Sequence, residues 1–303
     1  MELSLIVVKQ ILVMFLLSSV GYLLFKSKRL TMEGSRCLGQ IMIYGSLPCV
    51  IINGFLVDRT PEHLSGLLWS AIAAAVSLLI AIVISHFLFP KNGMDNFASC
   101  FSNAGFFGIP LISATLGSEY VFYLAAYIAF LNLLQWTYGM ALLKGENGKI
   151  TLKQVLTAPF MIAIIIGLFL FLTQIPVHSV IKSCLTNIAN LNTPLAMFVT
   201  GVYLAGTDFR KMMQKQPLYT VSAVRLLLIP AVTMVILAFF PEEVRTCVLI
   251  AAACPVGTNI AIYAQLLNKD YTYASETVVL STLLCVISIP VIVLLANFLW
   301  NIL

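Results

Sequence analysis

The amino-acid sequence predicts an all-α polytopic membrane protein, with ten transmembrane helices arranged as two inverted five-helix repeats. Three observations predict this fold: an apolar composition, ten apolar runs, and proline-marked breaks that recur in both halves. Of the 303 residues, 60% are hydrophobic and 10% are Asp, Glu, Lys or Arg. Because a soluble domain carries about 25% charged residues, the composition excludes a soluble or secreted enzyme.

The apolar runs are separated by charged residues or by Gly and Pro, and a membrane-spanning helix needs roughly 20 residues. They cover residues 3–25, 37–57, 67–89, 96–117, 119–143, 154–174, 180–206, 217–240, 243–267 and 273–300. The first run begins after Glu2 rather than after a basic cluster, and no A-x-A site follows it. We therefore expect a retained helix and not a cleaved signal peptide.

Cysteine spacing and net charge exclude two further classes of site. The seven cysteines are scattered, mostly inside apolar runs, without the spacing of a zinc site or the density of a disulfide scaffold. We accordingly expect no metal site and no catalytic residues. The net charge of +5 does not form a nucleic-acid patch, and its distribution indicates topology instead.

The loops that follow the odd-numbered runs hold most of the Lys and Arg residues. Twelve of the 17 lie there: Lys26, Lys28, Arg29, Arg36, Lys91, Lys144, Lys149, Lys153, Arg210, Lys211, Lys215 and Lys269. Arg59, Lys182 and Arg245 lie in the even loops, and Lys9 and Arg225 lie inside runs. Since cytoplasmic loops collect Lys and Arg, we expect a multi-pass cell-membrane protein with both termini outside the cytoplasm.

Proline-containing segments recur at one spacing. Pro48 in the second run and Pro194 in the seventh are 146 residues apart, and Pro110 in the fourth and Pro255 in the ninth are 145 apart. We therefore divide the chain into a first repeat, residues 1–143, and a second repeat, residues 144–303. With five spans in each half, the halves must have opposite orientations, as in many secondary transporters.

The fourth run contains a predicted helix break. Its sequence S-N-A-G-F-F-G-I-P includes Gly105, Gly108 and Pro110. Gly costs about 1 kcal/mol and Pro about 3 kcal/mol in a helix interior, and Pro110 has no N–H to donate to the carbonyl of Phe106. Irregular backbone at bilayer depth survives only where protein or a wet cavity surrounds it.

The ninth run repeats this feature with A-C-P-V-G-T-N. Pro255 is expected to free the carbonyl of Ala251, and Gly257 to loosen the next turn. Each second half-helix should begin near its proline and direct about half a positive charge at the membrane centre. The two breaks should cross there, with Asn103, Thr258 and Asn259 beside bare backbone. The alternative is a pair of simple kinks in packed helices.

These segments resemble the auxin efflux carrier family. The resemblance rests on S-N-A-G-F-F-G-I-P-L, A-C-P-V-G-T-N-I-A-I-Y-A-Q and L-S-T-L-L, and it covers the whole chain. That family includes plant PIN auxin transporters and bacterial malonate and malate permeases. The chain lacks the long central loop of many plant members, since its own loop runs only from Lys144 to Lys153.

The resemblance implies a fold similar to bile-acid symporters and NhaA-type antiporters. Spans one, two, six and seven would form a scaffold, and the other spans a moving transport domain. Asn103 and Pro110 fall on the family's first crossover segment, and Pro255 and Gly257 on the second. Plant members have P-x-G-I-V-P where this chain has P-V-G-T-N, so shared substrate contacts there are not implied.

Other polar residues in the spans are weaker candidates. Asn132 and Gln135 share a helix face, and the sequence does not choose between substrate contacts and interhelical hydrogen bonds for them. Asn53 could face the site, although helix packing is the preferred reading. Ser281 and Thr282 more often bond back to their own helix.

Arg225 lies about eight residues into the eighth span and is a candidate for attracting an anion, with snorkelling to the interface as the alternative. Lys9 is a weaker candidate of the same kind. Asp and Glu lie only near the ends of the spans, which disfavours a proton antiporter with carboxylate relays. No cofactor is expected, and the sequence does not decide between Na⁺ coupling, H⁺ coupling and neither.

The function expected is secondary transport of a small organic anion, a mono- or dicarboxylate, by alternating access at the crossover. The alternative is a membrane sensor that binds such an anion without moving it. An intramembrane enzyme ranks last, because no His lies deep enough to serve Cys100, Cys254 or Cys285. The expected partners are the anion and the lipid bilayer; direction of flux and a homodimer are not decided.

Overall fold

The computed structural model describes residues 2–144 and 156–302, which are helical apart from short connections and one isolated β-bridge. The helical segments, in chain order, are α1 (Glu2–Lys26), α2 (Met32–Ile41), η1 (Met42–Ser46), α3 (Leu47–Phe55), α4 (Pro61–Leu88), α5 (Gly93–Cys100), η2 (Ala104–Gly108), α6 (Ile109–Thr115), η3 (Ser118–Tyr120), α7 (Val121–Leu134), η4 (Gln135–Gly139), α8 (Met140–Lys144), α10 (Pro159–Thr173), α11 (Ser179–Ala189), α12 (Asn192–Gly206), α13 (Phe209–Met212), α14 (Gln216–Ala223), η6 (Val224–Leu228), α15 (Ile229–Leu237), α16 (Glu242–Ala253), α17 (Asn259–Leu266) and α18 (Tyr271–Ile302). Most of the central loop, Lys144 to Lys153, lies outside the described residues.

Seven helices of the described chain are long and apolar enough to cross a membrane. They are α1, the continuous α2–η1–α3, α4, the continuous α7–η4–α8, α11–α12, α14–η6–α15, and α18. The prediction of a polytopic all-α membrane protein is therefore confirmed. Each of the other three predicted spans contains shorter helices: α5 and α6 in 96–117, α10 in 154–174, and α16 and α17 in 243–267.

Short π-helical turns precede three of the prolines within these helices. Leu47, Ile109 and Ile229 each donate a backbone N–H to the carbonyl five residues earlier, and each is followed by proline. A proline cannot donate the usual bond to the carbonyl four residues back, and a wider turn before it is one way to continue the helix. The helices therefore continue through these prolines.

Helices from the two halves of the chain pack against each other, and α1 contacts both α12 and α18. α1 packs along α12, while α3 packs against α10 and α11; α4 packs against α5, α7 and α16, and α18 against α14, α16 and α17. The contact of α1 with α12 is close because of two glycines. A Cβ built on Gly201 would lie 1.9 Å from the Ser18 carbonyl oxygen, and one on Gly21 would lie 2.3 Å from that of Phe198.

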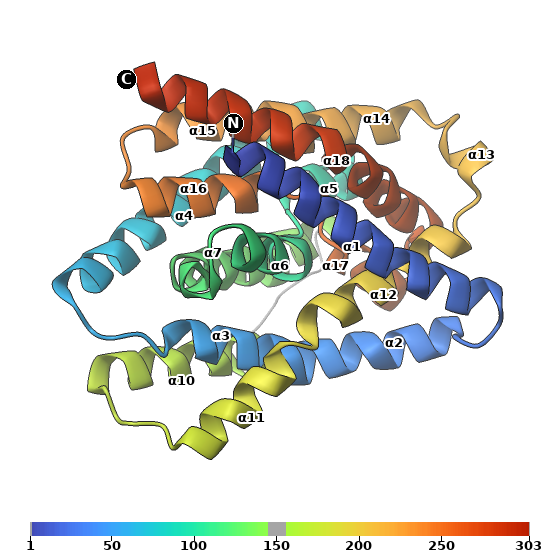
Figure 1. The fold of residues 1–303 in the computed structure, drawn as a ribbon. Helices are drawn as coiled ribbons and strands as arrows, with labels where there is room; N and C mark the ends of the chain where they lie inside the picture. Colours follow the sequence, from blue (N-terminus) through green and yellow to red (C-terminus); the bar gives the residue numbers. More distant parts are fainter. Residues whose placement is uncertain (1, 145–155, 303) are drawn as a thin grey trace.

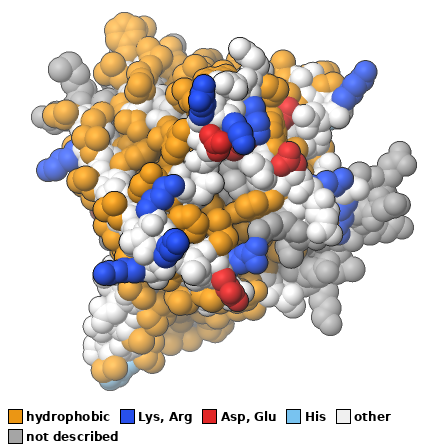
Figure 2. Space-filling model, turned by 90° about the vertical axis from the view of Figure 1, so that its right-hand side faces the viewer, with side chains coloured by type: hydrophobic (Ala, Val, Ile, Leu, Met, Phe, Trp, Pro, Cys, Tyr) orange, Lys and Arg blue, Asp and Glu red, His pale blue; other side chains and the backbone are white. Residues whose placement is uncertain are grey.

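Both termini lie at one end of the helix array, together with the α3–α4, α10–α11 and α15–α16 connections (Figure 1). The α1–α2 connection and α13 lie at the opposite end, where Figure 2 shows many Lys and Arg side chains and few Asp or Glu. The exposed Lys26, Lys28, Arg29 and Arg210 belong to this end. The basic residues that follow the first and seventh predicted spans therefore lie at the same end of the molecule.

Candidate functional site

Two helices are interrupted in the middle of the molecule. The first interruption is residues 101–103, between α5 and η2. The second is residues 254–258, between α16 and α17. Both lie within spans where breaks were predicted, but their limits differ from the prediction.

The first break lies before the glycine-rich segment, not within it. Gly105 and Gly108 belong to η2, and Pro110 lies in the first turn of α6, where its missing N–H is tolerated. In the second break Pro255 is unwound as expected, but the next helix begins four residues later, at Asn259. The Ala251 carbonyl is not free, because it accepts a hydrogen bond from the Cys254 N–H at 3.4 Å.

The two interruptions pair with each other through their backbones. The Asn103 N–H donates to the Pro255 carbonyl at 2.8 Å, and the Gly257 N–H donates to the Phe101 carbonyl at 2.9 Å. Ser102 and Val256 form the antiparallel bridge between them. The peptide groups freed by one break are therefore satisfied in part by the other, as buried backbone requires. We call this paired segment, residues 101–103 and 254–258, the crossover.

Small residues permit this close approach. A Cβ on Gly257 would lie 3.2 Å from the Ser102 carbonyl oxygen and 3.3 Å from that of Phe101. A Cβ on Gly108 would lie 3.2 Å from the Cys254 Sγ. Neither position has room for a larger side chain without movement of its neighbours.

Two hydroxyl groups support the crossover from neighbouring helices. The Ser281 Oγ accepts a hydrogen bond from the Val256 N–H at 3.0 Å while donating to the Val278 carbonyl of its own helix. The Ser102 hydroxyl lies 3.3 Å from the Tyr127 hydroxyl. Back-bonding by Ser281 was predicted; its contact with the crossover could not be read from spacing alone.

Arg225 lies behind the crossover and is completely buried, with 0% of its surface exposed. Its Nη1 donates to the carbonyls of Ser99 and Cys100, at 3.1 and 2.8 Å, and its Nη2 donates to that of Ala252. These carbonyls lie at the C-terminal ends of α5 and α16, where helix dipoles place partial negative charge. One guanidinium therefore caps both first half-helices.

This arrangement differs from both readings made for Arg225 from the sequence. The side chain neither reaches the interface nor lines the cavity described below, so no dissolved anion can contact it in this conformation. Lys9, the weaker candidate, is exposed on α1 and is also absent from the cavity lining.

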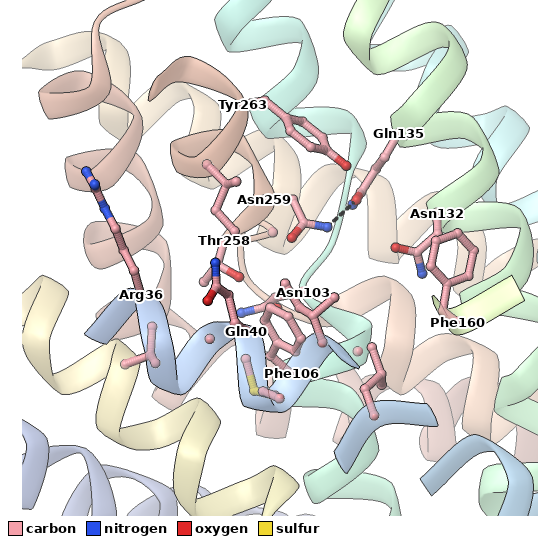
Figure 3. Close-up of a pocket in the computed structure, with 18 of the residues that line it drawn as sticks. Arg36, Gln40, Asn103, Phe106, Asn132, Gln135, Phe160, Thr258, Asn259 and Tyr263 are labelled. Carbon is pink, nitrogen blue, oxygen red and sulfur yellow. Dashed lines mark hydrogen bonds between the residues drawn. The ribbon is translucent and has the colours of Figure 1, made fainter. Parts of the chain in front are cut away.

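A cavity of about 680 Å³ lies on the other side of the crossover (Figure 3). Seven of the proposed site residues line it: Asn103, Gly105, Asn132, Gln135, Gly257, Thr258 and Asn259. They come from three segments of the sequence: residues 103–105, 132–135 and 257–259. The second half-helices, η2–α6 and α17, begin at this cavity with Ala104 and Asn259, so their N-terminal ends point to it.

The polar side chains at the crossover end of the cavity are only partly satisfied. The Asn259 Nδ2 donates to the Gln135 Oε1 at 2.6 Å, shown by the dashed line in Figure 3. The Thr258 hydroxyl is buried and has no hydrogen-bond partner among the described residues. The Asn132 Nδ2 donates to the Ile128 carbonyl of its own helix at 2.8 Å. Amide and hydroxyl groups are thus available to a polar ligand.

Besides Arg225, four of the predicted site residues lie outside the cavity lining. Pro255 belongs to the crossover itself, Gly108 packs against Cys254 of the crossover, and Pro110 lies in the first turn of α6. Asn53 donates to the Thr186 Oγ1 at 3.4 Å, between α3 and α11, which is the packing role preferred from the sequence.

Several lining residues were missed. They are the polar Arg36 and Gln40 on α2 and the aromatic Phe106, Trp136, Phe160, Tyr203, Tyr263 and Tyr271. The spacing of Arg36 and Gln40, four residues apart and so on one helix face, was an available signal. The aromatic residues carry no such signal among the many apolar residues of the spans.

No Asp or Glu side chain of the described chain lines this cavity. The buried carboxylates are engaged elsewhere: Asp95 accepts from Tyr273 and Asn92 at 2.6 and 2.7 Å, and Glu276 pairs with Lys215 at 2.5 Å. The described lining of the cavity consequently consists of aliphatic and aromatic side chains, neutral polar groups and one cation.

Interrupted helices that meet at a cavity with polar groups at the crossover, inside an apolar helix array, are the architecture of membrane transport proteins. A family model described as "Membrane transport protein" matches residues 6–293, and the chain belongs to this family, that of the auxin efflux carriers. The chain is therefore a transporter and not an enzyme. It is 24% identical over 300 residues to a Rhizobium meliloti (strain 1021) protein named "Putative malonate transporter", an alignment covering 92% of each chain.

Proposed function

We propose that this protein is a secondary transporter of small organic anions, mono- or dicarboxylates, that works by alternating access at the crossover. The observation that carries the proposal is the position of two helix N-termini, at Ala104 and Asn259, beside one cavity lined by Asn103 and Thr258. Helix N-termini favour anions because their N–H groups are unpaired and their dipoles are positive. The name of the Rhizobium meliloti relative supports a carboxylate substrate.

In this proposal, Asn103, Thr258 and Asn259 donate hydrogen bonds to a substrate carboxylate, and Gln135 orients Asn259. Asn132 completes the polar wall, and Gly105 leaves room for the ligand. Neutral donors bind an anion less tightly than a buried cation would, so the anion can also be released at the end of each transport cycle.

The proposal also includes the fuller topology: ten membrane crossings in the cell membrane, with α5–α6 and α16–α17 as broken spans and α10 as the sixth. Residues 1–143 and 144–303 are then inverted repeats, with both termini outside. The packing of α1 with α12 and of α3 with α10 and α11 fits a scaffold, and the helices around the crossover fit a moving domain. The basic end in Figure 2 would then face the cytoplasm.

Uptake into proteoliposomes tests the proposal. The purified protein is reconstituted, and entry of radiolabelled malonate is measured for the wild type and for Asn103→Ala, Asn259→Ala and Asn190→Ala. Asn190 is exposed at the end of α11 and serves as the matched control. We expect at least about tenfold slower uptake for the two crossover variants, corresponding to loss of one hydrogen bond to a charged group, and no change for the control.

Equal uptake by all four proteins would remove the crossover from the mechanism. Saturable binding of several carboxylates without any flux would instead favour the alternative, a membrane sensor. Repeating the wild-type measurement with and without a Na⁺ or pH gradient identifies the coupling ion, if there is one.

A further inference from the structure

Arg36 is the one charged side chain among the described residues that line the cavity. It lies on α2, one turn after the first residue of this helix, Met32. It is exposed, and the described residues provide it with no hydrogen bond and no ion pair. An Arg that faces a cavity without a carboxylate partner is available to a ligand.

One face of α2 and its continuation forms the wall of the cavity on this side. Met32, Arg36, Gly39, Ile43 and Leu47 recur at intervals of three and four residues along this wall. The start of the wall is fixed by the Thr31 side chain, which accepts the Gly34 N–H at 3.0 Å. Arg36 therefore has a defined place on a regular helix.

Figure 3 shows Arg36 and Gln40 extending from α2 to the same side, with Gln40 beside Asn103 and Thr258. Since four residues span about 6 Å along a helix, Arg36 lies roughly one turn beyond Gln40. The cavity thus has neutral donors at the crossover and a positive charge at a separate point on α2. A ligand with two separated negative groups matches this layout.

We propose that Arg36 is a specificity-determining residue that binds the second carboxylate of a dicarboxylate whose first carboxylate lies at the crossover. The proposal rests on the proposed function and assigns dicarboxylates as the preferred substrates. The planar guanidinium fork matches a carboxylate with two hydrogen bonds, which a lysine ammonium cannot reproduce. A monocarboxylate uses only the crossover and leaves Arg36 in water, where a free cation is stable.

Two ligands with the same carbon chain but different charge test this role directly. Malonate and its monomethyl ester have the same three-carbon chain but differ by one negative charge. Binding of each to detergent-purified full-length protein is measured by calorimetry for wild type, Arg36→Gln, Arg36→Lys and Arg29→Gln. Arg29 is an exposed cation outside the cavity lining, so its variant removes one charge from the same end of the molecule.

We expect Arg36→Gln to weaken malonate binding about tenfold or more, as for loss of a charge-assisted hydrogen bond, and to change binding of the ester less than twofold. The affinity of Arg36→Lys for malonate should lie between those of the wild type and Arg36→Gln. If Arg36→Gln misfolds, the weaker malonate binding of Arg36→Lys tests the proposal in its place. Arg29→Gln should leave both affinities unchanged.

Three results from the variants would overturn the proposal. They are equal losses for both ligands in Arg36→Gln, the same loss of malonate binding in Arg29→Gln, or no loss at all. A wild-type protein that binds the ester as well as malonate refutes the role of Arg36 but leaves the proposed function intact. A wild-type protein that neither binds nor transports any carboxylate refutes the proposed function itself.

Discussion

The Asn103 N–H donates to the Pro255 carbonyl at 2.8 Å, although the two residues lie in different halves of the chain. With the reciprocal bond from Gly257 to Phe101, it joins two unwound segments that would each leave peptide groups unpaired in an apolar medium. The pairing leaves the N-terminal ends of η2 and α17 directed to one cavity. The C-terminal ends of α5 and α16 face Arg225 on the other side.

Removal of the Arg225 guanidinium should destabilise the protein strongly. Arg225→Met leaves the carbonyls of Ser99, Cys100 and Ala252 buried without this donor, and we expect a loss of about 3 kcal/mol or more in the free energy of unfolding. Thermal unfolding in detergent measures the effect. Lys9→Met, at an exposed position, is the control, and equal melting temperatures for the two variants would show that the capping contributes nothing.

Two glycines at the cavity should respond differently to substitution. Gly257→Ala places a methyl group about 3.2 Å from the Ser102 carbonyl oxygen, so we expect lower thermal stability and slower uptake. A Cβ on Gly105 meets nothing within 4 Å, so Gly105→Ala should preserve the melting temperature. Gly105→Leu should fill part of the cavity and block uptake while the protein stays folded. If Gly257→Ala transports as the wild type does, close backbone contact is not required.

Gln135 and Asn259 should be energetically coupled. Their side chains share a hydrogen bond of 2.6 Å at the cavity, so the effects of Gln135→Ala and Asn259→Ala on malonate affinity should not be additive. We expect a coupling free energy of about 1 kcal/mol from a double-mutant cycle measured by calorimetry. Additive effects would mean that Gln135 acts on the ligand independently of Asn259.

The contact of α1 with α12 should depend on Gly201. Gly201→Ala forces a Cβ against the Ser18 carbonyl oxygen, and we expect a loss of more than about 1 kcal/mol in stability, as for overpacking of a core. Gly45→Ala is the matched control, because a Cβ there meets nothing within 4 Å. Similar melting temperatures for both variants would show that the two helices separate at little cost.

Sequence patterns predicted the class of fold and the two interrupted spans, because apolar runs and clustered Gly and Pro act locally. They did not give the limits of the breaks. The second half-helix was expected to begin near Pro110, but it begins at Ala104 with a π turn that continues into α6, and residues 101–103 are unwound instead. Residues 101–103 are unwound where they pair with the segment around Pro255, and that segment is distant in sequence.

The candidate site was predicted only in part, because the sequence signals are local and the surrounding helices are distant in sequence. Asn103, Thr258 and Asn259 lie next to the Gly and Pro signals, and all three line the cavity. The roles of Arg225 and Arg36 depend on which helices surround them. The position of Arg225 inside a span suggested either an anion contact or snorkelling to the interface, whereas the structure places its guanidinium against three carbonyl groups.

The most direct test of the account is an experimental structure of the protein in lipid with bound malonate. We expect both breaks to be present and paired, with one malonate carboxylate within hydrogen-bond distance of Asn103, Thr258 or Asn259. Density for malonate away from these residues, or an unbroken helix through residues 101–103 or 254–258, would contradict the central claim that the crossover binds the transported anion.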